Sequence, residues 1–391
     1  MKPLSSLKIL DLTTLVPGPL ATMMLADMGA NVVRIEAPHR PDAVRFLPPF
    51  DGDISAWHAI LNRNKRSIAL DLKQPEAIEI VKRLVQTYDI VVEQFRPGVM
   101  DRLGIGYEAL KAVNPRLIYC AITGYGQTGP YKDRAGHDNN FVALSGAMSY
   151  SGRRDQGPPP LGFQLADLGG SMGAITGILA AVIQRTATGE GQMVDISMFD
   201  MAVAWQAHLA SNYLAGGEVP AREQMLLNGA GIYDYYETSD GRFLAVASLE
   251  PKFWQGFCQA IQRPDLIEPG MSMETAVLQQ VKTDIRVVIA GKTWEEWTAV
   301  FANLDVCVEP VLTIPEMVEH PHTQARGLIV NVPRPNGMSQ RQVGSPIRFS
   351  ASEAEYRGVG TAVGAHTEEV LLQIGYNQKE FDTLQEAKTF G

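Results

Sequence analysis

Short apolar segments alternate with helix-like segments through the first 120 residues, and this alternation constrains the fold more than any other feature of the chain. The apolar segments have the length and the Val and Ile content of buried strands. Strands that alternate with helices form a mostly parallel sheet covered by helices on both faces. The predicted strands are residues 7–12, 31–36, 66–72, 90–93 and 117–122, and the predicted helices are residues 20–28, 76–88 and 107–113.

A β-rich region later in the chain predicts a second, smaller domain. Strand-like residues 233–237 and 243–248 are joined by Thr238-Ser239-Asp240-Gly241, a hairpin signal. Helical patterns follow at residues 251–261 and 293–301. We therefore predict an α/β fold, with a Rossmann-like large domain interrupted by a small α+β domain. The predicted bounds are 1–196 for the first part of the large domain, 197–228 for a linker, 229–305 for the small domain, 306–325 for a second linker and 326–391 for the rest of the large domain.

The charge distribution argues against a protein that grips nucleic acid or an anionic membrane. The 391 residues carry 34 Lys and Arg against 43 Asp and Glu, a net charge of −9, with no long basic run. Residues 1–103 contain 13 basic and 12 acidic residues, so this part is +1 and the remainder is −10. The first quarter is thus the electropositive end and is suited to a small polyanion.

Cysteine usage and apolar segments indicate a soluble cytoplasmic protein. Cys120, Cys258 and Cys307 are widely spaced, which favours neither a disulfide framework nor a zinc site. Asp11 interrupts the apolar stretch that a signal peptide needs. The most apolar segment, residues 172–183, is shorter than the roughly 20 residues of a membrane span. We expect no metal site and no membrane span.

The first predicted strand–helix–strand unit resembles a dinucleotide fold only superficially. Glu36 closes the second strand where a ribose-binding acid would lie. The turn, however, is Val16-Pro17-Gly18-Pro19, which lacks GxGxxG and places prolines where N–H donors should face a pyrophosphate. These residues argue against nicotinamide or flavin binding and predict a break before the helix.

Three residues are candidates for acid–base chemistry, each with a structural alternative. His137 lies in a polar loop before a helix, where it is either a base near neutral pH or a capping histidine. Asp167 precedes a long apolar helix and is first of all an ordinary N-cap. Glu250 precedes Pro251 at the end of a strand, where it is either functional or the cap of the next helix.

Small residues after Asp167 leave two interpretations open. Gly169, Gly170, Ser171 and Gly173 lower helix propensity, so something must approach their backbone closely. Either an anion lies at this helix N-terminus or the helix packs tightly against the sheet.

Basic residues of the first hundred positions are suited to phosphates, since several stand in loops after strands. A solvated basic surface is the alternative. The set is Arg34, Arg40, Arg45, Arg63, Lys65, Arg66, Lys73, Arg96 and Arg102.

Ordered motifs along the whole chain resemble the class III CoA-transferase superfamily (CaiB/BaiF-like), and within it most resemble the α-methylacyl-CoA racemases. The racemase resemblance adds Gly136-His137-Asp138, Leu249-Glu250-Pro251 and the spacing of 30 residues between His137 and Asp167. The superfamily motifs lie at residues 7–12, 32–36, 64–73, 93–104, 123–130, 189–195 and 364–367.

This resemblance implies roles for the three candidates. Asp167 matches the superfamily's shared aspartate, which attacks the thioester in transferases and acts as an acid–base group in racemases. His137 matches the racemase base, and Glu250 matches a glutamate that contacts that histidine. The implied reaction is epimerisation of 2-methylacyl-CoA through an enolate, with helix N–H groups after Asp167 holding the enolate oxygen.

The resemblance also implies a partner and a ligand. Its members form interlocked, ring-like homodimers, so Glu250 is expected to act on the partner's histidine. Coenzyme A is part of the substrate, and no separate cofactor is expected. The expected CoA contacts are Arg34, Arg40, Leu72, Lys73, Gln94, Phe95, Arg96 and Arg102.

Two other functions fit the same residues. The first is a CoA-transferase that moves CoA between carboxylic acids through an acyl anhydride on Asp167. The second is a non-catalytic acyl-CoA-binding protein. Asn139 and Phe141 depart from the racemase pattern and are expected to alter the acyl pocket, whereas the sequence 248–252 lacks the glycine-rich flap of some transferases.

Overall fold

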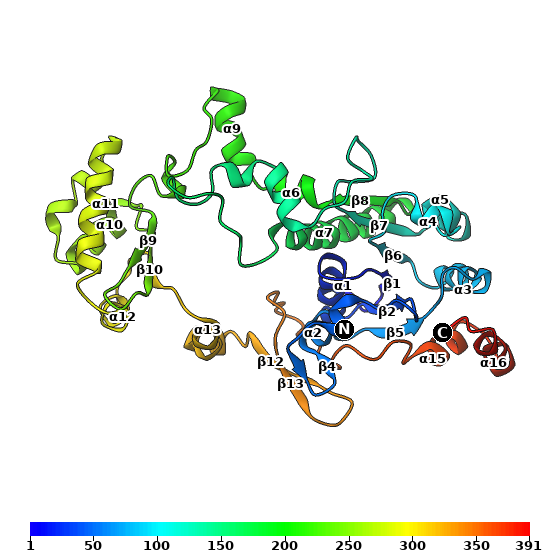
Figure 1. Ribbon diagram of the computed structural model, residues 1–391. Coiled ribbons are helices and arrows are strands. Elements are labelled where there is room, and N and C mark those ends of the chain that lie inside the picture. The colour runs from blue at the N-terminus through cyan, green and yellow to red at the C-terminus, as the bar shows by residue number, and fades with distance from the viewer. The chain divides into compact units, whose positions relative to one another are not determined.

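Six parallel strands form the largest sheet of the computed structural model, which describes residues 1–391 (Figure 1). Their order is β5-β2-β1-β6-β7-β8. Strands β2 and β5 follow on one side of β1, and strands β6, β7 and β8 follow on its other side. All neighbouring strands run parallel, which confirms the predicted parallel α/β sheet. The strands are β1 (Lys8–Leu12), β2 (Asn31–Glu36), β5 (Arg66–Ala69), β6 (Ile90–Glu93), β7 (Ile118–Thr123) and β8 (Met193–Ser197).

Helices cover the sheet, and α3 (Pro75–Val85) shows how the sequence produces this cover. Its apolar residues recur at helical spacing, and Ile80, Val81 and Leu84 are buried in the core with the side chains of the strands. The other helices of the sheet-bearing part are α1 (Pro17–Asp27), α2 (Ala56–Leu61), α4 (Val99–Arg102), α5 (Tyr107–Val113), α6 (Asp138–Leu144), α7 (Leu165–Thr188), α8 (Met198–Ala204), α14 (Pro321–Ala325), α15 (Thr367–Gln373) and α16 (Gln378–Glu386).

The first helix begins earlier than the sequence predicts. Pro17 and Pro19 lie inside the first turn of α1 and do not precede it as a break. Proline is tolerated there because the first N–H groups of a helix have no partner within the helix.

Helix α7 extends beyond the most apolar segment of the sequence on both sides. It extends over 24 residues, because the small and polar residues on either side of 172–183 continue the helix. By length and composition alone it is able to cross a membrane, a test that the core helix of a soluble protein also passes. Half of its most apolar window is buried, and the helix packs against α1, α8, β7 and β8.

The edge strand β5 is covered by residues from near the C-terminus. The Ser67 N–H donates to Nδ1 of His366 at 3.1 Å, and the His366 N–H donates to the Ser67 carbonyl at 2.8 Å. The Ala69 N–H donates to the Thr367 hydroxyl at 3.1 Å. The outer edge of β5 is therefore hydrogen-bonded although no further strand pairs with it.

The chain forms two compact units, which we call unit 1 and unit 2. Unit 1 consists of Met1–Ser145, Gly162–Ala204 and Pro321–Gly391, and it holds the parallel sheet. It also contains two hairpins, β3 (Phe50–Asp51) with β4 (Ile54–Ser55) and β12 (Ile329–Pro333) with β13 (Ser339–Val343).

Unit 2 consists of Gly146–Leu161 and Trp205–His320 and contains an antiparallel sheet of order β11-β10-β9. Its core contains the buried rings of Trp254, Phe257 and Trp297. Its elements are α9 (Ala207–Gly216), β9 (Asp234–Glu237), β10 (Phe243–Val246), α10 (Pro251–Ala260), α11 (Thr275–Ile289), α12 (Trp294–Phe301), β11 (Val308–Pro310) and α13 (Ile314–Glu319).

The units differ from the predicted domain bounds in one segment above all. Gly146–Leu161, expected in the large domain, belongs to unit 2. Arg153 explains why, since it forms ion pairs with Glu223 at 3.0 Å and with Asp234 at 2.6 Å. Helix α8 lies in unit 1 although the sequence predicts a linker there.

Candidate active site

The carboxyl ends of β1 and β6 lie side by side where the strand order reverses, and ligands of open parallel sheets bind outside such a point. Helix α1 begins at this place. The Gln94 side chain, directly after β6, accepts a hydrogen bond from the Gly18 N–H at 3.2 Å. Pro17 and Pro19 have no N–H, so the first turn of α1 presents no free donor cluster of the kind that holds a pyrophosphate.

Asp138 joins the segments that carry His137 and Asp167. His137 is the N-cap of α6, and its N–H donates to Oδ1 of Asn140 at 3.0 Å. The buried Asp138 carboxylate accepts the N–H of Ala166 at 2.6 Å and that of Asp167 at 3.1 Å. One acidic side chain thus fastens the first turn of α7 to the start of α6, close enough for the charge of His137 to act on the Asp167 carboxyl.

Asp167 is the third residue of α7, and the N-cap position belongs to Gln164. The expected N-cap role is therefore wrong. Burial, followed by the neighbouring Asp138 carboxylate, raises the pKa of Asp167 to about 6, while His137 acts in the opposite direction. A carboxyl with this pKa exists in both protonation states near neutral pH, as a group that gives and takes protons requires.

An aromatic cluster fixes the loop that carries His137. Phe141 is 2% exposed and meets Tyr125 edge-on, with ring centroids 5.1 Å apart. A Cβ added to Gly124 or Gly136 would lie 2.6 or 2.7 Å from the Phe141 ring. Glycine is needed at both positions because the ring lies against the loop backbone.

The small residues after Asp167 pack against neighbouring elements. A Cβ on Gly170 would lie 2.9 Å from Cγ of Met198, and one on Gly173 would lie 2.9 Å from Sδ of Met201. The Ser171 hydroxyl donates to the Pro17 carbonyl at 2.7 Å. Of the two interpretations left open by the sequence, close packing accounts for Gly170, Ser171 and Gly173.

The N–H groups at the start of α7 are already occupied. Those of Ala166 and Asp167 donate to Asp138, and that of Leu168 donates to the Gln164 carbonyl at 3.0 Å. The expectation that these groups hold an enolate oxygen is therefore wrong, because Asp138 is itself the anion at this helix end.

Glu250 lies in unit 2, at the N-cap position of α10. It is exposed, and its side chain makes no capping hydrogen bond to the helix. The structural alternative, a simple helix cap, is thus not supported by a hydrogen bond, and the carboxylate is accessible.

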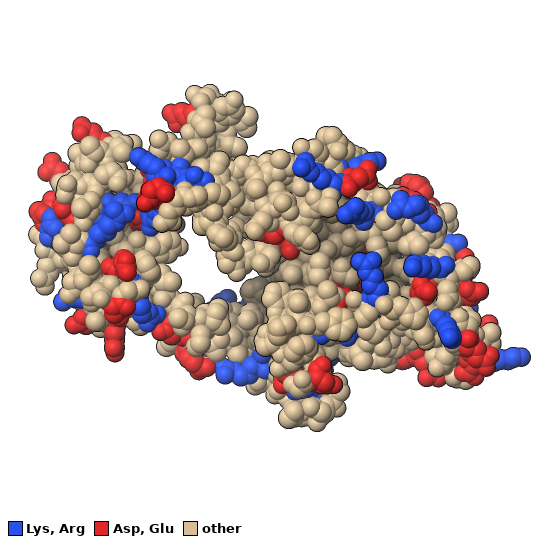
Figure 2. All heavy atoms as spheres, in the orientation of Figure 1, with Lys and Arg blue, Asp and Glu red and all other residues tan.

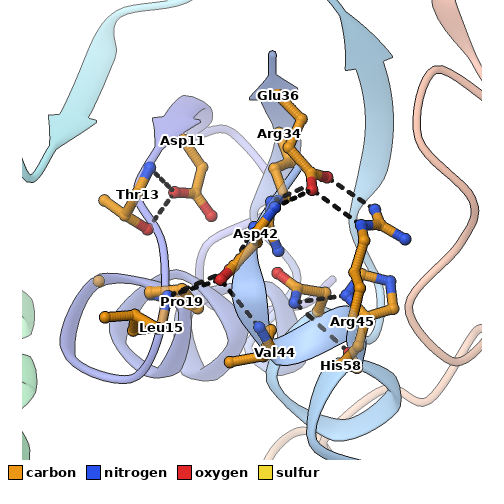
Figure 3. Close-up of polar contacts among 12 residues, drawn as sticks. Asp11, Thr13, Leu15, Pro19, Arg34, Glu36, Asp42, Val44, Arg45 and His58 are labelled. Carbon is orange, nitrogen blue, oxygen red and sulfur yellow. Dashed lines mark hydrogen bonds and ion pairs between the residues drawn. The ribbon is translucent and has the colours of Figure 1, made fainter. Parts of the chain in front are cut away.

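Arg34, expected to contact CoA phosphates, is buried in an ion-pair network (Figure 3). It is 1% exposed and donates to Oδ2 of Asp42 at 2.6 Å, and its Nε lies 3.4 Å from Glu36. Arg45 binds the same Glu36 at 2.6 Å. In this structure the Arg34 guanidinium is not accessible to a ligand, because two carboxylates and the fold enclose it.

Other basic residues that the sequence suggested for phosphate binding also form ion pairs within the protein. Arg63 pairs with Asp27 at 2.6 Å, and Lys65 pairs with Asp11 at 2.9 Å, all within the core of unit 1. Arg66 is partly buried and bonds Glu369 at 2.8 Å, among other groups.

Four basic residues remain exposed, and they follow three strands of the parallel sheet. Arg40 follows β2, Lys73 follows β5, and Arg96 and Arg102 follow β6. On the face shown in Figure 2, basic and acidic side chains are intermixed over the β6–α5 region. Of the apolar or uncharged residues expected at CoA, Leu72 and Phe95 pack on the core and Gln94 bonds Gly18.

A cavity of about 480 Å³ lies within unit 2. Its walls include Tyr150, Arg153, Leu227, Tyr233 and Val246, whereas His137 and Asp167 belong to unit 1. This cavity and the acid–base pair are thus separate features of the chain.

Sequence reasoning missed two buried acids that organise the site, Asp138 and Glu93. Both lie in motifs of the family resemblance, Gly136-His137-Asp138 and residues 93–104, but the resemblance implied no role for either acid. Their importance depends on contacts with distant residues, which no local pattern records.

The chain is similar to known proteins along nearly its whole length. A model of CoA-transferase family III matches residues 4–367. The chain is 36% identical to human alpha-methylacyl-CoA racemase over 388 residues, which cover 98% of this chain and 97% of the relative. It is 35% identical to the succinate–glutarate CoA-transferase of Agrobacterium fabrum over 384 residues, 95% of this chain and 96% of that relative.

A solved structure extends the likeness to three dimensions. The crystal structure of a CaiB/BaiF family protein from Brucella suis matches with a TM-score of 0.84 and 30% identity, covering 95% of this chain and 99% of that one. Since the family model and these relatives span nearly the whole chain, this protein belongs to CoA-transferase family III.

Proposed function

We propose that this protein is a racemase that interconverts the (R)- and (S)-epimers of 2-methyl-branched acyl-CoA thioesters. The observation that carries the proposal is the Asp167 carboxyl, which Asp138 fastens beside the start of α6, where His137 lies, and whose pKa is raised to about 6 by burial. Two groups that exchange roles as acid and base must have similar proton affinities. The similarity to human alpha-methylacyl-CoA racemase supports the same reaction.

In the proposed reaction, His137 removes the proton from C2 of the acyl group. The C–H electron pair moves into an enolate, whose negative charge lies on the thioester oxygen. Protonated Asp167 then donates its proton to C2 from the opposite face, which inverts this carbon. The reverse reaction exchanges the two roles, and the enolate oxygen needs a donor other than the Ala166 and Asp167 N–H groups, which bind Asp138.

The proposed site includes a residue from a second subunit. The accessible Glu250 carboxylate would contact the partner's histidine and hold its tautomer, as the family resemblance implies. The exposed Arg40, Lys73, Arg96 and Arg102 would bind the phosphates of CoA.

Deuterium exchange tests the proposal. Incubation of one epimer of a 2-methylacyl-CoA in D2O is expected to place deuterium at C2 while the other epimer forms. His137→Ala and Asp167→Ala should each lower epimerisation by roughly 10² to 10⁴-fold, the usual size of a general acid–base contribution. His39→Ala, at an exposed histidine in unit 1, should leave the rate unchanged. Lack of exchange with every 2-methylacyl-CoA tested contradicts the proposal.

A CoA-transferase is the second candidate, because the Agrobacterium transferase is nearly as similar to the chain as the human racemase. Asp167 would then attack the thioester carbonyl carbon as a carboxylate, form an acyl anhydride and release CoA thiolate. This reaction predicts that His137→Ala retains activity with a carboxylate acceptor and that hydroxylamine traps acylated Asp167. Acyl-CoA binding without either reaction would indicate a binding protein.

A further inference from the structure

Glu93 is a buried acid that neither proposed reaction uses. It is the last residue of β6 and is 4% exposed. Its Oε2 accepts the N–H of Phe95, two residues later, at 2.6 Å. The hydroxyl of Tyr119, a β7 residue that is 2% exposed, donates a second hydrogen bond to the same carboxylate.

The surroundings of Glu93 provide hydrogen bonds and no compensating positive charge. The groups of neighbouring elements that act on it are Tyr119 and Cys120 of β7, Asp101 of α4 and Asp195 of β8. Burial, opposed by the Phe95 and Tyr119 hydrogen bonds and strengthened by the two aspartates, raises the pKa of Glu93 to about 7. An ionised acid in this place is costly, so a purely structural need would be met better by a neutral residue.

The Glu93 hydrogen bonds fix the loop that follows β6, at the point where the strand order reverses. With its N–H held by Glu93, Phe95 packs on the core. Gln94 on one side of it reaches the Gly18 N–H at the start of α1, and Arg96 on the other side is exposed. A hydrogen bond between residues 93 and 95 therefore supports the conformation in which Gln94 reaches α1 and Arg96 is exposed.

We infer that Glu93 is a positioning residue for coenzyme A: it holds the 94–96 loop in the conformation in which Gln94 is bonded to α1 and Arg96 is exposed to the phosphates of the ligand. The inference rests on the proposed acyl-CoA function but not on the choice between racemase and transferase. Glu93 acts through the loop and does not touch the reacting atoms.

Binding of free coenzyme A, measured by calorimetry, tests the inference apart from any activity. Glu93→Gln, which keeps the size of the side chain, is expected to weaken CoA binding roughly tenfold, because the Phe95 N–H then meets a neutral amide in place of a carboxylate. Tyr119→Phe removes one bond only and should weaken binding less. Glu108→Gln, on exposed α5, is the matched control and should bind CoA like the natural protein.

Kinetics supply a second measurement. In whichever reaction is found, Glu93→Gln should raise KM for the acyl-CoA with little change in kcat, because the loop positions the ligand and not the acid–base pair. If the variant unfolds at a lower temperature yet binds CoA as tightly as the natural protein, Glu93 is structural only and the inference is overturned. If the natural protein itself does not bind CoA, the proposed function fails instead.

The pH dependence of CoA binding distinguishes a positioning role of Glu93 from a role in packing alone. As pH falls through about 7, Glu93 becomes protonated and is a weaker acceptor, so CoA affinity of the natural protein should fall more steeply than that of Glu93→Gln. Asp101→Asn removes a negative charge that raises the Glu93 pKa, and it should shift this fall to lower pH. Equal pH profiles for the natural protein and Glu93→Gln contradict the inference.

Discussion

The environment of Asp167 favours proton transfer and lowers folding stability. Its carboxyl is partly buried and faces Asp138, and both features raise its pKa to about 6. An unfolded aspartate ionises near 3.8. Between these two values the unfolded chain loses its proton while the folded chain keeps it, so folding stability decreases as pH rises.

Asp167→Asn should therefore stabilise the protein at high pH while it abolishes proton transfer. At pH 8 the natural carboxylate is ionised in both states and the full penalty applies. At pH 4 most of the penalty is absent. After allowance for partial exposure we expect a gain of about 1–2 kcal/mol at pH 8 and little at pH 4. Urea unfolding at both pH values measures it, and an equal change at the two values would contradict the explanation.

Residue-level predictions from the sequence failed where the environment of a side chain depends on distant partners. Arg34 and Arg63 look like phosphate ligands in the sequence, but Asp42 and Asp27 neutralise them in the fold. Asp27 and Arg63 are 36 residues apart, and no periodicity joins them. His137 and Asp167 were recognisable because a family pattern, and not their local chemistry, distinguishes them.

At the scale of elements, α7 carries the site at its first turn and packs along the sheet through its glycines. Gly173 faces Met201, whose flexible side chain has room to move, whereas Gly177 faces Cγ1 of Val194 on β8 at 2.6 Å from an added Cβ. Val is stiff because it branches at Cβ.

Alanine substitutions at these two positions should therefore differ. Both gain about 1 kcal/mol of helix propensity. Gly173→Ala should be within about 1 kcal/mol of neutral because Met201 gives way, whereas Gly177→Ala should lose about 1–3 kcal/mol overall through overpacking. Urea midpoints of the two variants provide the comparison. Equal stabilities would mean that β8 moves as easily as a methionine side chain.

Helices and strands were predictable from the sequence where one spacing of apolar residues dominates. The strand and helix pattern of the first half follows apolar spacing, so β2 and α5 agree with the predicted residues 31–36 and 107–113. The start of α1 was missed because proline has two meanings, a break before a helix or a residue of its first turn.

At the scale of the whole molecule, the chain passes between its two units four times, and His137 and Glu250 belong to different units. The interlocked dimer predicted from the family resemblance assigns each active site residues from both subunits. The segment 146–161 was misassigned because its partners, Glu223 and Asp234, come from residues about 70 and 80 positions later.

Complementation between two inactive subunits tests this shared site. Co-expression of His137→Ala and Glu250→Ala chains with different tags should yield a mixed dimer in which one site carries both changes and the other carries neither. Such a dimer, purified through both tags, should have roughly half the activity of the natural dimer. Inactive mixed dimers alongside inactive parents would show that both residues of a site come from one chain.

The covered edge of β5 has a consequence for synthesis of the chain. During synthesis, the Ser67 N–H has no partner until His366 is made, 299 residues later. At about 5–20 residues per second, a ribosome needs roughly 15–60 s to make that stretch. Throughout this interval the nascent chain presents an unprotected strand edge, and such edges template aggregation. The segment that begins at His366 therefore protects the edge of the sheet, and a ribosome that stalls before it leaves a product that chaperones must hold.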